Sequence, residues 1–142
     1  TAAASGFTNG NGTVDVIPPS FDVSGLPATA TAGGADDAFT IRVGRANNNL
    51  PGSFLTSLQA VRAGAPGPVI VTVSAVPTTV GTLVTGSGTG SPAQVQIAPG
   101  QSSTLNNAVA FHPVGAGSVT LTTTIPGMVG ATNAIATITV NP

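Results

Sequence analysis

Hydrophobic and polar residues alternate along most of this chain with a period of two. The alternation is clearest in five short stretches, at residues 39–44, 69–74, 94–97, 119–122 and 137–140. Their apolar positions hold Val, Ile, Leu or Phe, and most intervening positions hold Thr, Ser, Gln or Arg. This pattern predicts β-strands with one buried and one solvated face.

Turn-forming residues separate these stretches, with Gly, Pro, Asn and Ser clustered between them. The spacing predicts an all-β fold, a two-sheet Greek-key β-sandwich of about seven strands. Residues 53–63, SFLTSLQAVRA, are harder to interpret, because Phe54, Leu58 and Val61 have helical spacing. That segment fits either a short helix or an irregular edge strand.

The start of the chain resembles its end. Residues 6–18, GFTNGNGTVDVIP, and residues 130–142, GATNAIATITVNP, are identical at six of thirteen positions at a constant offset of 124. This match predicts that residues 1–18 are the last hairpin of a preceding repeat, or a linker strand, and that the sandwich comprises residues 19–142. The alternative is chance similarity between two strands rich in Gly, Thr and Val.

Charged residues are scarce. Four Asp and three Arg, with no Lys or Glu, make up 5% of the chain, against roughly 25% in a typical soluble domain. The net charge of −1 leaves no basic stripe for nucleic acid and no polybasic patch for a membrane surface. The sequence has no cysteine for disulfides or thiolate metal sites, and no apolar run long enough to insert into a membrane.

Three segments near the C-terminus carry a family resemblance. VQIAPGQSS at 95–103, GAGSVTLTTTIPG at 115–127 and NAIATITVNP at 133–142 resemble the second half of bacterial Ig-like repeats. PPSFDVSG at 18–25 fits the first strand of such a repeat. The resemblance implies an Ig-like sandwich, a place in a large secreted or cell-surface protein, and neighbouring repeats or subunits as partners. The chain lacks the Cys pair and core Trp of antibody domains.

Candidate catalytic chemistry is sparse. His112 is the only histidine, and strand parity places it opposite Val109 and Phe111, on the surface. Because the chain has no Cys, Glu, Lys or Tyr, an acid–base system would have to combine His112 with aspartates. We therefore expect no catalytic residue and no enzymatic activity.

Asp36 and Asp37 form the best candidate for a metal site, with Asp15 or Asp22 as further ligands. Calcium takes six to eight oxygen ligands, however, and no Asp-x-Asp-x-Asp spacing is present. An Asx turn that starts a strand at Ala38 is the favoured interpretation. We predict no metal and no cofactor.

The solvated face of the C-terminal strands is rich in threonine. Three threonines of one strand are expected to form a cross-strand ladder with two of the next, and the five are Thr120, Thr122, Thr124, Thr137 and Thr139. A ladder of this kind occurs on ice-binding surfaces, but an ordinary exposed face is the favoured interpretation.

The sequence therefore predicts a non-catalytic structural or adhesive repeat of an extracellular or cell-surface protein. One alternative is a subunit of an extracellular filament or virion fibre that assembles by strand donation. Another is a glycan-binding accessory module. The glycan alternative is disfavoured, because sugar rings usually stack on Trp or Tyr and the chain has neither.

Overall fold

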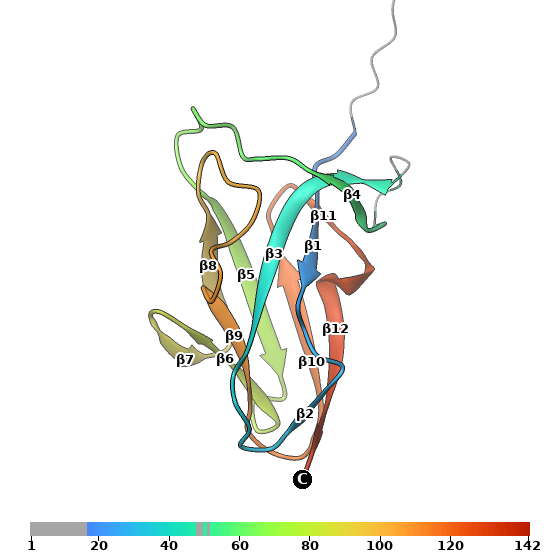
Figure 1. The fold of residues 1–142 in the computed structure, drawn as a ribbon, viewed down its shortest axis with the longest axis vertical. Coiled ribbons are helices and arrows are strands. Elements are labelled where there is room, and N and C mark those ends of the chain that lie inside the picture. Colours follow the sequence, from blue (N-terminus) through green and yellow to red (C-terminus); the bar gives the residue numbers. More distant parts are fainter. Residues whose placement is uncertain (1–16, 48–49, 51) are drawn as a thin grey trace, which may run out of the picture.

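The computed structural model describes residues 17–47, 50 and 52–142, which form two packed β-sheets (Figure 1). Sheet I contains, in spatial order, β11 (Val129–Gly130), β1 (Ser20–Ser24), β3 (Asp37–Ala46), β9 (Val109–Pro113), β6 (Gly81–Thr85) and β7 (Gly88–Gly90), with β4 (Leu55–Leu58) paired to β3. Sheet II contains β2 (Thr29–Thr31), β12 (Ile135–Asn141), β10 (Gly117–Thr124), β5 (Val69–Val76) and β8 (Ala93–Ile97). Of the predicted preceding-repeat segment, residues 1–18, only Ile17 and Pro18 lie within the described residues.

Most connections between consecutive strands cross from one sheet to the other. In the described residues only the steps from β3 to β4 and from β6 to β7 stay within a sheet. The last crossing runs from β11 through a short 3₁₀ turn, η2 (Thr132–Ala134), into β12. The predicted all-β sandwich is confirmed. It has more strands than the predicted seven or so, because β2, β4, β6, β7 and β11 are short pieces of two to five residues.

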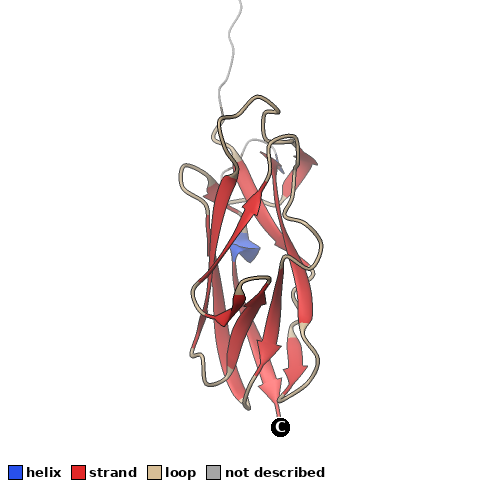
Figure 2. Ribbon diagram, turned by 90° about the vertical axis from the view of Figure 1, so that its left-hand side faces the viewer, coloured by secondary structure: helices blue, strands red, loops and turns tan. Residues whose placement is uncertain are grey.

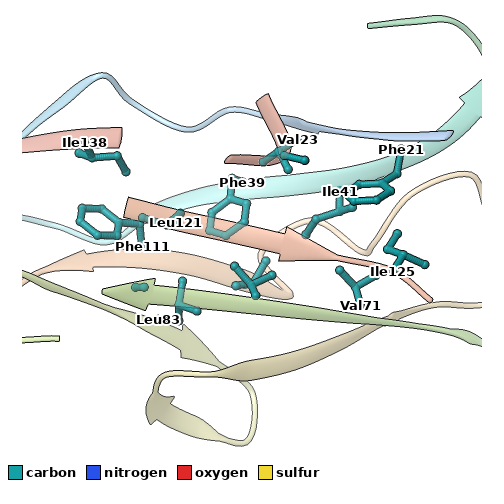
Figure 3. Close-up of a cluster of buried hydrophobic side chains, with 14 of the residues drawn as sticks. Phe21, Val23, Phe39, Ile41, Val71, Leu83, Phe111, Leu121, Ile125 and Ile138 are labelled. Carbon is teal, nitrogen blue, oxygen red and sulfur yellow. The ribbon is translucent and has the colours of Figure 1, made fainter. Parts of the chain in front are cut away.

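The core lies between the sheets, and the predicted alternation decides which side chains enter it. In β3, Phe39, Ile41 and Val43 are buried, whereas Thr40 and Arg42 are partly exposed. The other large buried side chains come from both sheets, among them Phe111 and Leu83 from sheet I and Leu121, Ile138 and Val71 from sheet II (Figure 3). Burial of apolar area on this scale is the main force that holds the two sheets together.

Two Pro-Gly turns occur where the sequence places them. At Ala98–Gln101 the N–H of Gln101 donates to the carbonyl of Ala98 at 3.0 Å, and Gly100 has a φ of +83°. At Ile125–Met128 the N–H of Met128 donates to the carbonyl of Ile125 at 3.2 Å, and Gly127 has a φ of +76°. Both are type II turns, in which the third residue needs the positive φ that glycine tolerates.

The ambiguous segment at 53–63 contains no helix. Its middle forms β4, an edge strand antiparallel to the end of β3, with a register shift between Arg45 and Ala46. The strands approach closely at Gly44, where a Cβ would overlap the carbonyl of Ser57 and lie 3.0 Å from Cα of Leu58. An irregular edge strand, one of the two sequence interpretations, is therefore correct.

The sandwich is elongated, and the chain enters and leaves it at opposite ends (Figures 1 and 2). We call the end where residues 17–19 lead into β1 the entry pole, and the end where β12 finishes at Pro142 the exit pole. At the entry pole the N–H of Val129 donates to the carbonyl of Pro19 at 3.0 Å. At the exit pole the N–H of Ala32 donates to the carbonyl of Asn141 at 2.8 Å. The long axis therefore joins the two ends of the described chain.

Candidate functional site

The most buried ionisable group in the described chain is Asp22, on β1. Phe21 and Val23 point into the core, so Asp22 points out of sheet I, yet its side chain is only 1% exposed. Arg42 lies directly opposite on β3 and donates two hydrogen bonds to it, from Nε to Oδ1 at 2.8 Å and from Nη2 to Oδ2 at 2.7 Å. This two-pronged geometry is the strongest form of a carboxylate–guanidinium pair.

The pair neutralises both charges within sheet I. The hydrogen bond to Asp22 raises the pKa of Arg42 above its ordinary value, so the guanidinium stays protonated. In the sequence, Asp22 is a candidate calcium ligand beside Asp36 and Asp37. The structure argues against this role, because both carboxylate oxygens of Asp22 are already bonded to Arg42. The pair therefore has a structural role in joining β1 to β3.

His112 is on the surface, as strand parity predicts. Its neighbours Val109 and Phe111 are fully buried, whereas the His112 side chain is 39% exposed. The structure adds a partner that the sequence did not indicate: Nδ1 of His112 lies 2.7 Å from Oδ1 of Asp36, whose side chain is 44% exposed. Because both groups are open to solvent, the pair is weakly stabilising.

Replacing His112 with alanine should change the free energy of unfolding by no more than about 0.5 kcal/mol, as is usual at exposed sites. Urea denaturation of the variant and of the wild-type chain, compared at neutral pH, measures this difference. Thr120→Ala, also at an exposed strand position, is the matched control. A loss of several kcal/mol would contradict the surface role assigned to His112.

The described residues do not assemble a metal site. No group of three or more His, Cys, Asp or Glu side chains occurs among them. Asp36 pairs with His112, and Asp37 begins β3 one residue before the predicted start at Ala38. Asp15, the other ligand considered, lies outside the described residues. Among those residues, moreover, no helix has the length and apolar character to cross a membrane.

Sheet II has an outer face without ionisable side chains, which we call the neutral face. Its exposed polar residues come from β2, β8, β10 and β12, and they include Thr29, Thr31, Gln94, Gln96, Ser118, Thr120, Thr124, Thr137, Thr139 and Asn141. The predicted threonine ladder is only partly formed. Thr120 faces Thr137, but Thr139 faces Ser118, and Thr122 faces Ile135, which is 62% exposed.

Residues 130–142, which we call the closing segment, attach the end of the chain to β1. The N–H of Ala131 donates to the carbonyl of Phe21 at 2.8 Å, and the side-chain amide of Asn133 donates to the carbonyl of Val23. Thr132 donates to the carbonyl of Gly52 from its backbone N–H at 2.9 Å and from its hydroxyl at 3.2 Å. Asn133 thus occupies a backbone acceptor at the otherwise open edge of β1, which limits pairing with a foreign strand.

Gly130 allows this attachment. A Cβ at Gly130 would lie 2.9 Å from the Phe21 ring and 2.7 Å from Cβ of Ala134, distances that real Cβ atoms do not show. Beside it, a hollow of about 460 Å³ lies between β10 and η2, lined by Phe21, Ile125, Ala131 and others. None of the residues that line this hollow is ionisable.

Comparison with known proteins agrees with this architecture. No protein-family model matches the chain, and no curated protein matches its sequence. Among solved structures, the crystal structure of domains 4 and 5 of the S-layer protein SbsC is similar, with a TM-score of 0.50 and 15% sequence identity. The match covers 86% of this chain and 51% of the other, so this chain spans about half the length of that structure. At this level of identity the similarity shows a shared fold.

Proposed function

We propose that this chain is a load-bearing, non-catalytic structural domain of a bacterial cell-surface protein, used end to end with similar domains. The observation that carries the proposal is the parallel pairing of β2 with β12 in a sandwich whose chain ends lie at opposite poles. A strand from the N-terminal part of the chain, β2, thus lies beside the C-terminal strand, β12, and runs in the same direction.

This arrangement places hydrogen bonds in shear when the two ends of the chain are pulled apart. Tension at the exit pole pulls β12 outward, and tension at the entry pole pulls β1, and through it β2, the opposite way. The β2–β12 contact includes bonds from Thr139 N–H to the carbonyl of Ala28 at 3.1 Å and from Ala32 N–H to the carbonyl of Asn141 at 2.8 Å. Bonds perpendicular to the force share the load, so they must break together rather than one at a time.

The same force also places the contacts between β1 and its neighbouring strands, β3 and β11, in shear. β1 pairs with β3 over five residues, Ser20 to Ser24, and the Asp22–Arg42 bonds join these two strands. β1 also pairs in parallel with β11, which belongs to the C-terminal part of the chain. Both ends of the domain are therefore held by lateral contacts, which supports a role in resisting tension.

Exposed apolar side chains at both poles support contact between successive domains. On and beside β4, towards the entry pole, Leu50, Phe54 and Leu58 are 60%, 59% and 49% exposed. Towards the exit pole, Val76 at the end of β5 and Val114 after β9 are 63% and 45% exposed. Stacking the exit pole of one domain on the entry pole of the next would cover apolar surface that is otherwise in water.

A cell-surface location is supported by the S-layer protein with which the chain shares its fold. A non-catalytic role is supported by the ionisable groups, since Asp22 is bonded to Arg42 and the His112–Asp36 pair lies open to solvent. A glycan-binding role gains no support, because Phe54 is the only exposed aromatic side chain in the described part of the chain.

Single-molecule force spectroscopy tests the load-bearing role. Pulling the full chain by its two termini should give a higher unfolding force than pulling between Thr31→Cys and a cysteine added after Pro142. The second geometry peels β12 from β2 starting at their shared exit-pole end, so bonds break in succession. Forced unfolding reports the unfolding rate constant under load. Equal forces in the two geometries would contradict the load-bearing role.

A further inference from the structure

β8 is a terminal strand of sheet II, and in the described part of the chain no other strand lies along its outer edge (Figure 1). It has five residues, whereas the terminal strands β2, β7 and β11 have two or three each. Natural edge strands are usually protected by short length, charged side chains, proline or a bulge. The sequence of β8, AQVQI, has no proline or charge, and its five pairs with β5 are in continuous register. β8 therefore offers a regular backbone edge without these protections.

Two glutamines present the backbone groups of this edge. The hydroxyl of Ser91, just before β8, accepts a hydrogen bond from the N–H of Ala75 at 2.7 Å and donates one to its carbonyl at 3.0 Å. Ala75 thus turns both backbone groups towards β8, and in an antiparallel ladder every second residue of β5 does the same. The β8 partners of these residues are Ala93, Val95 and Ile97. The N–H and carbonyl groups of Gln94 and Gln96 therefore point away from β5, to the free edge.

A groove of about 440 Å³ lies beside the free edge. Val95 and Gln96 of β8 line one side of it, and Leu105, Ala108 and the turn between β6 and β7 line the other. The Leu105 side chain is 72% exposed, more than any other large hydrophobic side chain of the described residues. A strand placed along β8 would lie in this groove and cover apolar surface that is otherwise in water.

The edge carries no charge that would repel an identical edge. None of the residues lining the groove is ionisable, and between residue 63 and the end of the chain His112 is the only ionisable side chain. Two copies that meet about a two-fold axis bring the same surface patch together, so a charged edge would place like charges side by side. A neutral edge avoids this cost, and it offers no electrostatic attraction to a charged partner. The charge distribution therefore favours a second copy of this chain as the partner.

The sequence of β8 is also complementary to its own reverse. When β8 is set antiparallel to a copy of itself with Val95 on the axis, Gln94 faces Gln96 and Ala93 faces Ile97. Both glutamine pairs then lie on the neutral face, where their side-chain amides can bond to each other. Valine faces valine on the other side of the sheet. The same register brings the backbone groups of Gln94 and Gln96 opposite each other, which a shift of one residue would prevent.

We propose that two copies of this domain associate side by side through β8, which pairs antiparallel with β8 of the second copy about a two-fold axis at Val95. Gln94 of each copy exchanges backbone hydrogen bonds with Gln96 of the other, and the two copies of sheet II become one continuous sheet. Leu105 of each copy lies beside the added strand. This contact is lateral, so it is independent of the stacking of poles and of the load-bearing role.

Analytical ultracentrifugation of the full chain tests the contact. We expect a reversible monomer–dimer equilibrium with a dissociation constant below about 1 mM, as for a small, transient interface. A chain that stays monomeric up to about 1 mM would overturn the proposal, and would do so even if β8 bound a strand of another protein.

Charges at the facing positions test the register. Gln94→Lys with Gln96→Lys places lysine opposite lysine in both pairs, and Gln94→Glu with Gln96→Glu does the same with glutamate. Both side chains are exposed, so each double variant should keep the circular dichroism and melting temperature of the wild-type chain. Alone, each should dimerise about tenfold more weakly or worse, because like charges directly opposite are destabilising. An equimolar mixture of the two should form a heterodimer, and failure to do so would contradict the proposed pairing.

A matched control carries the same charges elsewhere on the neutral face. Thr137→Lys with Thr139→Lys places two lysines at the same spacing on β12, which is separated from β8 by β10 and β5. It should dimerise as the wild-type chain does. Equal weakening in this control, or a dimer that tolerates the lysines on β8, would place the contact elsewhere, for example at the poles, and would overturn the proposal.

A cysteine at the axis tests the geometry directly, because the chain has no cysteine of its own. Val95 would face its equivalent as a pair without mutual backbone bonds, with Cα atoms about 4.5 Å apart, a separation that permits a disulfide. Under mild oxidation Val95→Cys should therefore form a covalent dimer, seen on a non-reducing gel. Thr137→Cys, at a more exposed position, is the control for random collision and should form much less. Equal cross-linking of the two variants would overturn the proposal.

Discussion

Replacing Phe111 with alanine should lower the free energy of unfolding by about 3–5 kcal/mol, the usual cost of removing a buried aromatic side chain. Phe111 is fully buried and lies among core side chains of both sheets (Figure 3). A domain is typically stable by only about 5–15 kcal/mol, so this loss is a large share. Urea denaturation followed by circular dichroism measures it, and an effect below about 1 kcal/mol would contradict the packing described.

The Phe111 ring also explains why residue 81 is glycine, and this contact provides a second test of the packing around Phe111. A Cβ at Gly81 would lie 2.5 Å from Cζ of Phe111, so Gly81→Ala alone should cost about 1–3 kcal/mol through overpacking. In the Phe111→Ala background the added methyl group enters vacated space. The double variant should therefore lose less stability than the two single losses added together. Strict additivity would show that Gly81 and Phe111 are not in contact.

Replacing Arg42 with leucine should cost about 3 kcal/mol, because it leaves the carboxylate of Asp22 without a partner. Asp22 is 1% exposed, so water cannot easily solvate it. The value lies at the low end of the usual range for broken buried pairs, because the Arg42 side chain is itself 37% exposed. Urea denaturation at neutral pH measures the loss.

The reverse substitution should be milder. Asp22→Ala leaves a guanidinium that is already partly exposed and can turn towards water, so it should cost less than Arg42→Leu. The double variant Asp22→Leu with Arg42→Leu should recover much of the loss, since apolar replacement of both partners removes the unpaired charge. Equal losses for the two single variants would mean that Asp22 is more accessible than the structure shows.

The strands that could be predicted from the sequence are those with a full alternation. Residues 39–44, 69–74 and 119–122 each place two or more β-branched or large apolar side chains on one face, and each lies in a long strand. Segments such as β2 and β7, three residues each, are too short to show a period. They form strands because the backbone of a neighbouring strand, β12 or β6, is there to pair with them. That neighbour is in place only in the assembled fold.

The ionic pairs could not be predicted for a related reason. Asp22 and Arg42 are 20 residues apart, and His112 and Asp36 are 76 apart, so each pairing depends on which strands become neighbours and in which register. Strand parity was enough to place His112 outside the core. Strand parity could not predict that Asp22 is buried. Its burial depends on how Arg42 and the surrounding segments pack over the outer face of β1.

The neutral face has a consequence for the conditions under which this domain can work. In the cell-surface location proposed above, the domain would meet media whose salt content and acidity the cell does not set. Interactions between exposed charges weaken as salt shortens the Debye length from about 10 Å at 0.1 M to about 3 Å at 1 M. The strands of sheet II contain no charged residue, so contacts made through this face have nothing to screen and nothing to titrate. Such contacts should therefore keep the same strength in dilute and saline, acidic and alkaline surroundings.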